Sequence, residues 1–137
     1  MAAELTLRVI TPDRIALDTT ADAVVFPAVD GLMGVLPMHA AMVAAVDAGM
    51  LTYTSGGKEQ TLFISGGFAE VRDDTVRFVT QAGELASEID EQRAREAEAR
   101  ARERLEQARS GQTDIDTLRA EAALRRALMR LQVRAGA

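Results

Sequence analysis

The chain has 137 residues, of which 47% are hydrophobic and 27% charged, and its formal net charge is −5. This composition is typical of one folded domain, or of a compact domain with a short appendage, and the acidic balance argues against nucleic acid as the main partner. Because the chain has no cysteine and a single histidine, His39, it excludes a disulfide scaffold, a cysteine nucleophile and a multi-histidine metal site. The longest apolar run, residues 40–46, is too short to span a bilayer, and the first residues lack signal-peptide features, so we expect a reducing compartment.

The composition changes abruptly near Gly83. Residues 1–83 hold all three prolines, every aromatic residue and eight of the ten glycines. Residues 84–137 have no proline and no aromatic residue, and they are rich in the strong helix formers Ala, Glu, Arg, Leu and Gln. We therefore predict two parts, 1–83 and 84–137, of different structural class.

The first part predicts an antiparallel β-sandwich or barrel. Residues 5–10 alternate between apolar and polar side chains, as in a half-buried strand. Further β-rich runs follow at intervals of about 8–12 residues, a spacing typical of all-β folds. They cover residues 23–26, 49–53, 59–64, 67–72 and 75–80. Turn residues at 55–58 and at Asp73-Asp74 predict two of the hairpin connections.

The second part predicts an α-helical hairpin. One helix is expected over 88–109 and a second around 115–131, separated by Ser110-Gly111-Gln112. Ser87 and Thr113, each followed three residues later by an aspartate, are predicted to cap the two helices. The apolar face of the first helix is mostly alanine, so we expect the hairpin to dock weakly and reversibly.

The segment 26–41 concentrates unusual residues and allows two interpretations. His39 could act as a base oriented by Asp30 or Asp47, but no nucleophile motif accompanies it, so we interpret the segment as a structured loop. Its large apolar side chains either form a contact surface or close the end of the sandwich. These side chains are Leu32, Met33, Leu36 and Met38.

The arginines of the second part form a weaker signal. No glycine-rich phosphate motif is present. Arg126 and Arg130 lie one helical turn apart, a spacing that can hold phosphate oxygens. The alternative is an ordinary solvated helix face paired with glutamates.

Several segments together resemble the epsilon subunit of bacterial F-type ATP synthase, which is called delta in mitochondria. The segment 30–40, DGLMGVLPMHA, is similar to the family signature of an acidic residue and glycine followed by Gly-aliphatic-x-Pro-Gly-His. DAGMLTY (47–53), LFISGGFAEV (62–71), EIDEQRAREAEARARERL (88–105) and ALRRALMRLQV (123–133) are similar to its later strands and helices. Leu32 and Met38 depart from the family, which often has Glu and Gly at these positions.

The resemblance implies a β-sandwich of about ten strands followed by a helix–loop–helix. It also implies a non-catalytic central-stalk subunit that couples proton flow to ATP synthesis, peripheral to the cytoplasmic face of the bacterial inner membrane. The implied partners are the gamma subunit, the membrane rotor ring of c subunits and, when the hairpin extends and inhibits ATP hydrolysis, the alpha–beta hexamer. The contact residues carried over to this chain are Asp30, Leu32, Met33, Met38 and His39.

The resemblance further implies ATP as a regulatory ligand, with no cofactor required. Ile89-Asp90, Arg93 and Ala94 match the family pattern [IL]-D-x-x-R-A, and Arg126 and Arg130 align with the arginines of that site. Glu88 and Asp90 are the only acids expected to offset these arginines. In the alternative reading, Ile89-Asp90 simply opens a helix.

Two other functions remain as alternatives at this point. One is a free-standing ATP-sensing module that uses the hairpin as its switch. The other is a small hydrolase built around His39.

Overall fold

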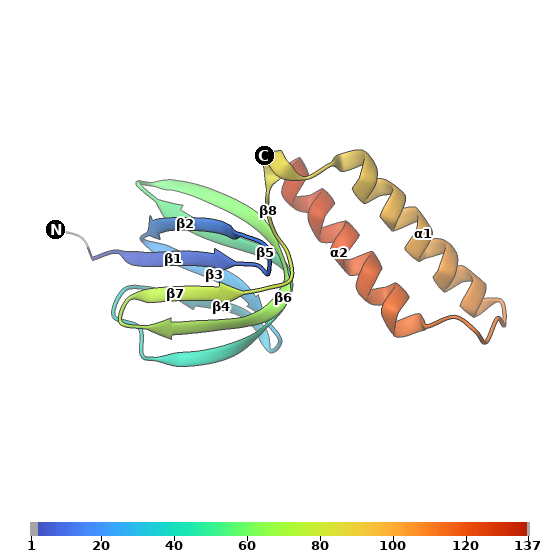
Figure 1. Cartoon of the computed structure of the whole chain (residues 1–137), viewed down its shortest axis with the longest axis horizontal. Helices are drawn as coiled ribbons and strands as arrows, with labels where there is room; N and C mark the ends of the chain where they lie inside the picture. Colours follow the sequence, from blue (N-terminus) through green and yellow to red (C-terminus); the bar gives the residue numbers. More distant parts are fainter. Residues whose placement is uncertain (1–2, 137) are drawn as a thin grey trace.

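The computed structural model describes residues 3–136 and consists of a two-layered β-sandwich followed by a helical hairpin (Figure 1). The strands are β1 (Leu5–Ile10), β2 (Ile15–Ala21), β3 (Ala23–Ala28), β4 (Gly31–Val35), β5 (Met42–Ser55), β6 (Lys58–Arg72), β7 (Thr75–Val79) and β8 (Gly83–Leu85). The predicted fold class is confirmed. The sheet extends to Leu85, slightly beyond the change in composition at Gly83.

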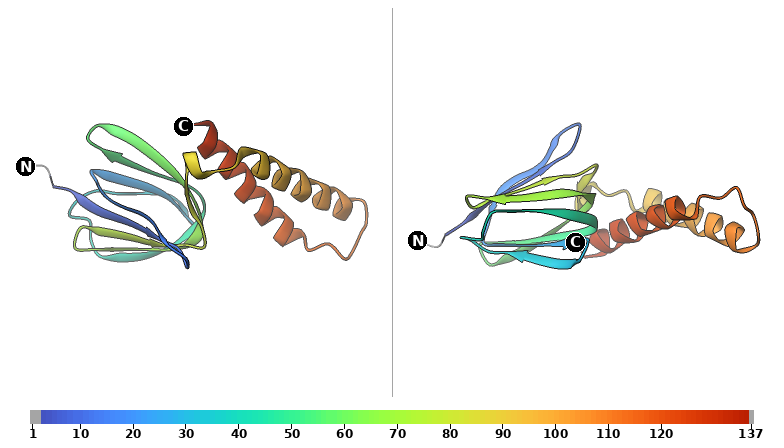
Figure 2. Two further views of the ribbon diagram at one scale, coloured as in Figure 1. Left: turned by 45° about the horizontal axis from the view of Figure 1, so that its top comes forward. Right: turned by 90° about the horizontal axis from the view of Figure 1, so that it is seen from below.

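Within the described residues, the strands form one hydrogen-bonded sheet in the order β2-β1-β7-β6-β5-β3-β4, and β8 pairs with β6. Neighbouring strands are antiparallel except β1 and β7, which are parallel. The sheet curves into two layers because β5 and β6, 14 and 15 residues long, continue from one layer into the other (Figures 1 and 2). This continuity accounts for eight strands where the resemblance implied about ten.

The bend in β6 depends on two consecutive glycines. Gly66 and Gly67 have φ angles of 93° and 108°, a region that residues other than glycine rarely adopt. A Cβ atom on Gly67 would also clash with the carbonyl oxygen of Val79 on the neighbouring strand. The pairing of β5 with β6 skips Asp47 and Gly66 at this point, as expected for a sharp local bend.

Three strands and part of a fourth were not predicted from the sequence. Strands β2, β4 and β8 and the first half of β5 lie outside the predicted β-rich runs, and β4 lies within the predicted loop 26–41. Strand β4 contains two glycines, which lower β propensity, but its residues still alternate. Met33 and Val35 point toward the core, whereas Leu32 and Gly34 are exposed.

The core follows from the alternation of apolar residues. In β1, Leu5, Leu7 and Val9 are fully buried, as predicted, while the intervening residues are half-buried. Phe26 of β3 meets Phe78 of β7 edge to face, with ring centroids 5.1 Å apart, which joins the two layers.

The hairpin consists of α1 (Glu91–Arg109) and α2 (Thr117–Ala135), preceded by a short 3₁₀ turn, η1 (Ala86–Glu88). The predicted caps were wrong. The side chains of Asp90 and Asp116 accept hydrogen bonds from the backbone N–H groups three residues later, at 3.1 and 3.0 Å, so each aspartate is itself the N-cap. Helix α1 therefore begins at residue 91 rather than 88, because residues 86–88 are held in the 3₁₀ turn.

Helix α2 lies between α1 and the sandwich, whereas α1 is on the far side of the hairpin (Figures 1 and 2). The two helices approach through small residues, namely Ala94, Ala101, Ala120 and Ala127, which are all buried. A second, small apolar cluster joins the hairpin to the sandwich through Phe63, Ile89 and Val133. In residues 3–136, neither helix has an apolar stretch long enough to cross a bilayer.

Candidate functional site: a charged pocket between hairpin and sandwich

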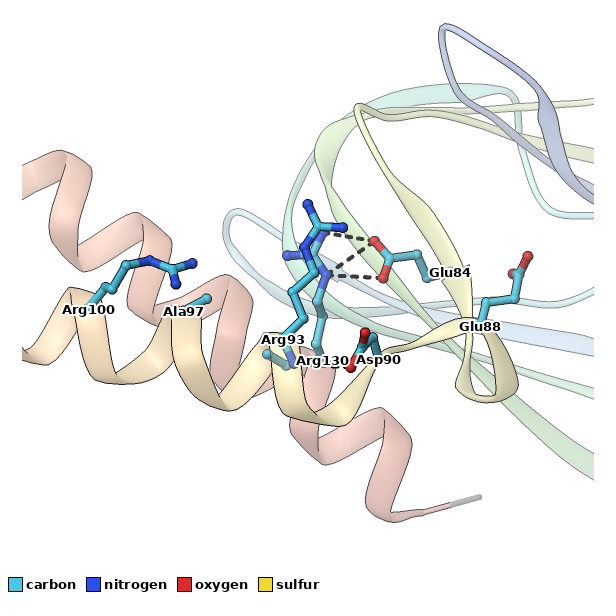
Figure 3. A pocket seen from close by; sticks show the side chains of 8 residues that line it. Glu84, Glu88, Asp90, Arg93, Ala97, Arg100 and Arg130 are labelled. Carbon is cyan, nitrogen blue, oxygen red and sulfur yellow. Dashed lines mark hydrogen bonds and ion pairs between the residues drawn. The ribbon is translucent and has the colours of Figure 1, made fainter.

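A cavity of about 510 Å³ lies where the start of α1, the end of α2 and strand β8 meet (Figure 3). We call it the hairpin pocket. Three arginines, three carboxylates and two alanines line it: Glu84, Glu88, Asp90, Arg93, Ala94, Ala97, Arg100 and Arg130. The pocket thus combines charged groups of both signs with the small side chains of two alanines.

The spacing of residues on α1 builds one wall of this pocket. Arg93, Ala97 and Arg100 are separated by four and three positions, so they share one face of the helix. The small side chain of Ala97 leaves space between the two guanidinium groups. Asp90 is the N-cap of this helix, and its side chain is held by the hydrogen bond that it accepts from the N–H of Arg93. Within residues 3–136, Arg93 and Arg100 make no ion pair, and both line the cavity.

Arg130 of α2 is held much more rigidly. Its Nε lies 3.1 Å from both carboxylate oxygens of Glu84, and its terminal nitrogen lies 2.8 Å from one of them. Its guanidinium carbon also lies 4.5 Å from the centre of the Phe63 ring. A bidentate, half-buried pair of this kind fixes the position of the arginine and joins α2 to β8.

Glu88, on the opposite side, is bound to the loop between β1 and β2. The Arg14 guanidinium donates to its two carboxylate oxygens at 2.7 and 3.1 Å and to the carbonyl oxygen of Gly83 at 2.8 Å. These hydrogen bonds, together with one from the N–H of Leu85, hold the pKa of the Glu88 carboxyl below its usual value. The same contact raises the pKa of Arg14. The linker into α1 is therefore tied to the sandwich.

Both parts of the chain match known domains. Residues 4–86 match the beta-sandwich domain of the ATP synthase delta/epsilon chain, and residues 87–134 match its long alpha-helix domain. The chain belongs to the ATP synthase delta/epsilon family. It is 48% identical to the ATP synthase epsilon chain of Symbiobacterium thermophilum over 131 residues, covering 95% of this chain and 92% of that one. It is 42% identical to the epsilon chain of Nitratidesulfovibrio vulgaris over the full length of both.

A solved structure supports the same assignment. The fold is similar to a chain in the mitochondrial ATP synthase of Euglena gracilis, with a TM-score of 0.77 and 29% identity, covering 92% of this chain and 78% of that one. A chain from the Tetrahymena thermophila enzyme shares the fold at a TM-score of 0.54 and 12% identity, covering 98% and 96% of the two chains.

The hairpin pocket brings together four of the residues that the family pattern pointed to. Asp90, Arg93, Ala94 and Arg130 all line it. Ile89, in contrast, is buried in the apolar cluster beside Phe63 and Val133. Arg126 is half-buried on α2 and is not among the lining residues.

Two charged lining residues were not predicted from the sequence. Arg100 could have been found, because it lies seven residues after Arg93 and so on the same helical face. Glu84 gave no signal, because only the fold places it against Arg130, 46 residues away. The expectation that Glu88 and Asp90 alone offset the arginines was wrong, since Glu84 makes the direct pair.

The residues predicted to contact gamma and the rotor ring lie before, within and after strand β4. Asp30 precedes this strand and Met38 and His39 follow it, so a strand of five residues, about 17 Å long, separates them in the chain. Leu32 and Met38 are 78% and 88% exposed. Met33, by contrast, is half-buried and packs against the core.

His39 does not have the surroundings of a catalytic base. Its Nδ1 donates to the carbonyl oxygen of Ala40 at 2.7 Å, and its backbone N–H bonds to Leu36. Asp30 lies at the other end of β4, and Asp47 accepts a bond from Arg125 at 2.7 Å. Neither aspartate orients the histidine, which removes the basis for the hydrolase alternative.

Proposed function

We propose that this delta/epsilon chain is a non-catalytic subunit of the central stalk, bound through its sandwich to the gamma subunit and the rotor ring. In this role it couples proton flow to ATP synthesis from the cytoplasmic face of a bacterial inner membrane. The subunit does not itself catalyse a reaction, because the alpha–beta hexamer carries out ATP synthesis in this family.

The observation that carries the proposal is an apolar outer face on strands β3 to β6. Strand β5 exposes Val43 and strand β6 exposes Phe68, whose neighbour in the sheet is Ala45. Val29 continues this row, because its N–H bonds to the carbonyl oxygen of Ala45, and Leu32 is exposed on β4. Such a concentration of exposed apolar side chains on one face favours a protein partner.

Capture by the gamma subunit tests this assignment. Phe68→Glu places a charge on the apolar face, at a side chain already 48% exposed, so the chain should fold and lose capture by about tenfold or more. Ile15→Glu is the matched control, because Ile15 is 61% exposed but lies on β2, at the other edge of the sheet. Equal capture of both variants and the parent chain would refute the proposal.

We further propose that the hairpin pocket binds ATP and so biases the hairpin toward its docked position. The cavity falls in the volume range of small-molecule sites, about 300–1,000 Å³. Arg93 and Arg100 supply positive charge for phosphates, while the Asp90 carboxylate could accept a bond from the adenine amino group. ATP bound to the docked hairpin alone would stabilise it by about 2.7 kcal/mol at a hundredfold excess over Kd.

Calorimetric titration of the full chain with Mg-ATP tests this second proposal. We expect heat release and a higher Tm, both abolished by Arg93→Ala. Arg95→Ala is the control, because Arg95 lies on the same helix but pairs with Glu91 outside the pocket. Absence of heat with the parent chain would leave mechanical coupling as the role of the subunit and would exclude the free-standing ATP-sensing alternative.

A further inference from the structure

Met38 has a backbone conformation that its side chain disfavours. Its φ angle is +68°, in the left-handed region where a Cβ atom meets the following carbonyl. The segment Leu36–His39 has the features of a type II turn. Pro37 is at the second position, Met38 is at the third, and the N–H of His39 bonds to the carbonyl oxygen of Leu36 at 3.2 Å. The third position of such a turn normally requires glycine.

A carboxylate from a distant turn holds this conformation. Asp74 Oδ1 accepts the backbone N–H of Met38 at 2.7 Å, although the two residues are 36 positions apart. A short bond between an amide and an ionised carboxylate is stronger than one between neutral groups. The contact therefore opposes the steric cost of the left-handed methionine.

Asp74 is itself firmly positioned. It forms the two-residue turn between β6 and β7 with Asp73, and both residues have positive φ angles, as in the type I′ turns that join antiparallel strands. Its carbonyl oxygen accepts the N–H of Thr6 on β1 at 2.8 Å. The carboxylate thus projects from a turn that joins β6 to β7 and is hydrogen-bonded to β1.

We propose that Asp74 is a positioning residue that locks the 36–39 turn, so that Leu36 and Met38 are displayed to the partner at this end of the sandwich. Both side chains are strongly exposed and would be free to retract if the turn relaxed. The inference rests on the proposed stalk function. It adds to that function the residue that shapes one contact and explains how this chain tolerates methionine at a glycine-like position.

Three variants separate positioning from simple turn stability. Asp74→Gly keeps the positive φ of the β6–β7 turn but removes the carboxylate. Asp74→Asn keeps an acceptor oxygen and also tolerates the left-handed region. Met38→Gly removes both the strain and the displayed side chain, so a chain with this change no longer needs Asp74.

The first measurement is amide hydrogen exchange of the full chain. In Asp74→Gly the Met38 amide should exchange about tenfold faster or more, and Asp74→Asn should restore most of the protection. The amide of Phe78 in the core reports whether the sandwich remains intact. Unchanged exchange at Met38 in Asp74→Gly would overturn the proposal.

The second measurement is binding to a complex of gamma with the rotor ring. Asp74→Gly should weaken binding about threefold or more in the parent chain but less than about twofold in the Met38→Gly background, because Met38→Gly has already removed the strain and the displayed side chain that Asp74 positions. Equal weakening in both backgrounds, or none in the parent, would overturn the inference. If Phe68→Glu also leaves binding unchanged, the stalk assignment itself fails, so the two failures are distinguishable.

Discussion

Arg125 of α2 donates to Asp47 of β5 at 2.7 Å, across 78 residues of sequence. Among residues 3–136, this contact is one of three ion pairs that join the hairpin and its linker to the sandwich. The other two are Arg130 with Glu84 and Arg14 with Glu88. With the small apolar cluster of Phe63, Ile89 and Val133, these ion pairs join the hairpin to the sandwich, so docking depends on a few identifiable contacts.

The three pairs should not contribute equally. Arg125 and Asp47 are largely exposed, so Arg125→Ala should weaken docking by at most about 1 kcal/mol. Arg130→Ala removes a bidentate pair and the contact with Phe63, and it leaves the half-buried Glu84 unpaired. We expect a loss of about 1–3 kcal/mol, measured as faster amide exchange in α2. Arg95→Ala is the control, and an equal effect of all three variants would contradict this ranking.

The apolar cluster should limit the stability of the hairpin. Val133 is fully buried against Phe63 and Ile89, so Val133→Ala should accelerate amide exchange throughout residues 91–135 by the equivalent of about 1–3 kcal/mol. The strands should retain their protection, because their core is separate. Leu118→Ala, at a 78% exposed position of the same helix, should change neither. Equal protection of strands and helices in the parent chain would show that the hairpin is not the weaker part.

Docking of the linker should also depend on pH. The pKa of Glu88 is lowered from its ordinary value of 4.5, so its contribution to stability is fully present above that value and is lost as the pH falls through the lowered pKa. The raised pKa of Arg14 keeps the guanidinium charged throughout this window. Amide exchange at residues 86–88 should therefore accelerate at acid pH in the parent chain and be less dependent on pH in Glu88→Gln. An identical pH profile in both would contradict the role of this pair.

The bend in β6 leads to a prediction about the sandwich. Gly67→Ala introduces a Cβ that clashes with the Val79 carbonyl at a positive φ, so it should destabilise the chain by about 3 kcal/mol or more. Gly34→Ala, at a glycine of β4 with open space around it, should change the free energy of unfolding by less than about 1 kcal/mol. Thermal unfolding of both variants measures the difference, and similar Tm values would show that the bend tolerates a side chain.

The sequence predicted those elements whose signal is local. The alternation of β1 and the change in composition near Gly83 were sufficient to predict a sandwich followed by a helical hairpin. Strand β4 was missed because its two glycines resemble a loop, and because its edge position leaves outward residues exposed. In the same way, Asp90 is the N-cap although the sequence predicts Ser87, because both residue types are good caps.

The pocket could be predicted only in part. Arg93 and Asp90 are linked by a short motif, and Arg130 follows from the family pattern. Glu84 could not be found, because its role depends on how β8 meets α2. The hydrogen bond between Asp74 and Met38 could not be predicted for the same reason, because the two residues are 36 positions apart in the sequence.

The most direct test of the stalk assignment is reconstitution of an ATP synthase from which the resident epsilon chain has been removed. We expect this chain to restore ATP-driven proton pumping, the Ile15→Glu control to restore it equally, and Phe68→Glu not to restore it. If the parent chain binds neither gamma nor the rotor ring and pumping is not restored, or if Phe68→Glu restores pumping as fully as the parent, the stalk assignment is contradicted.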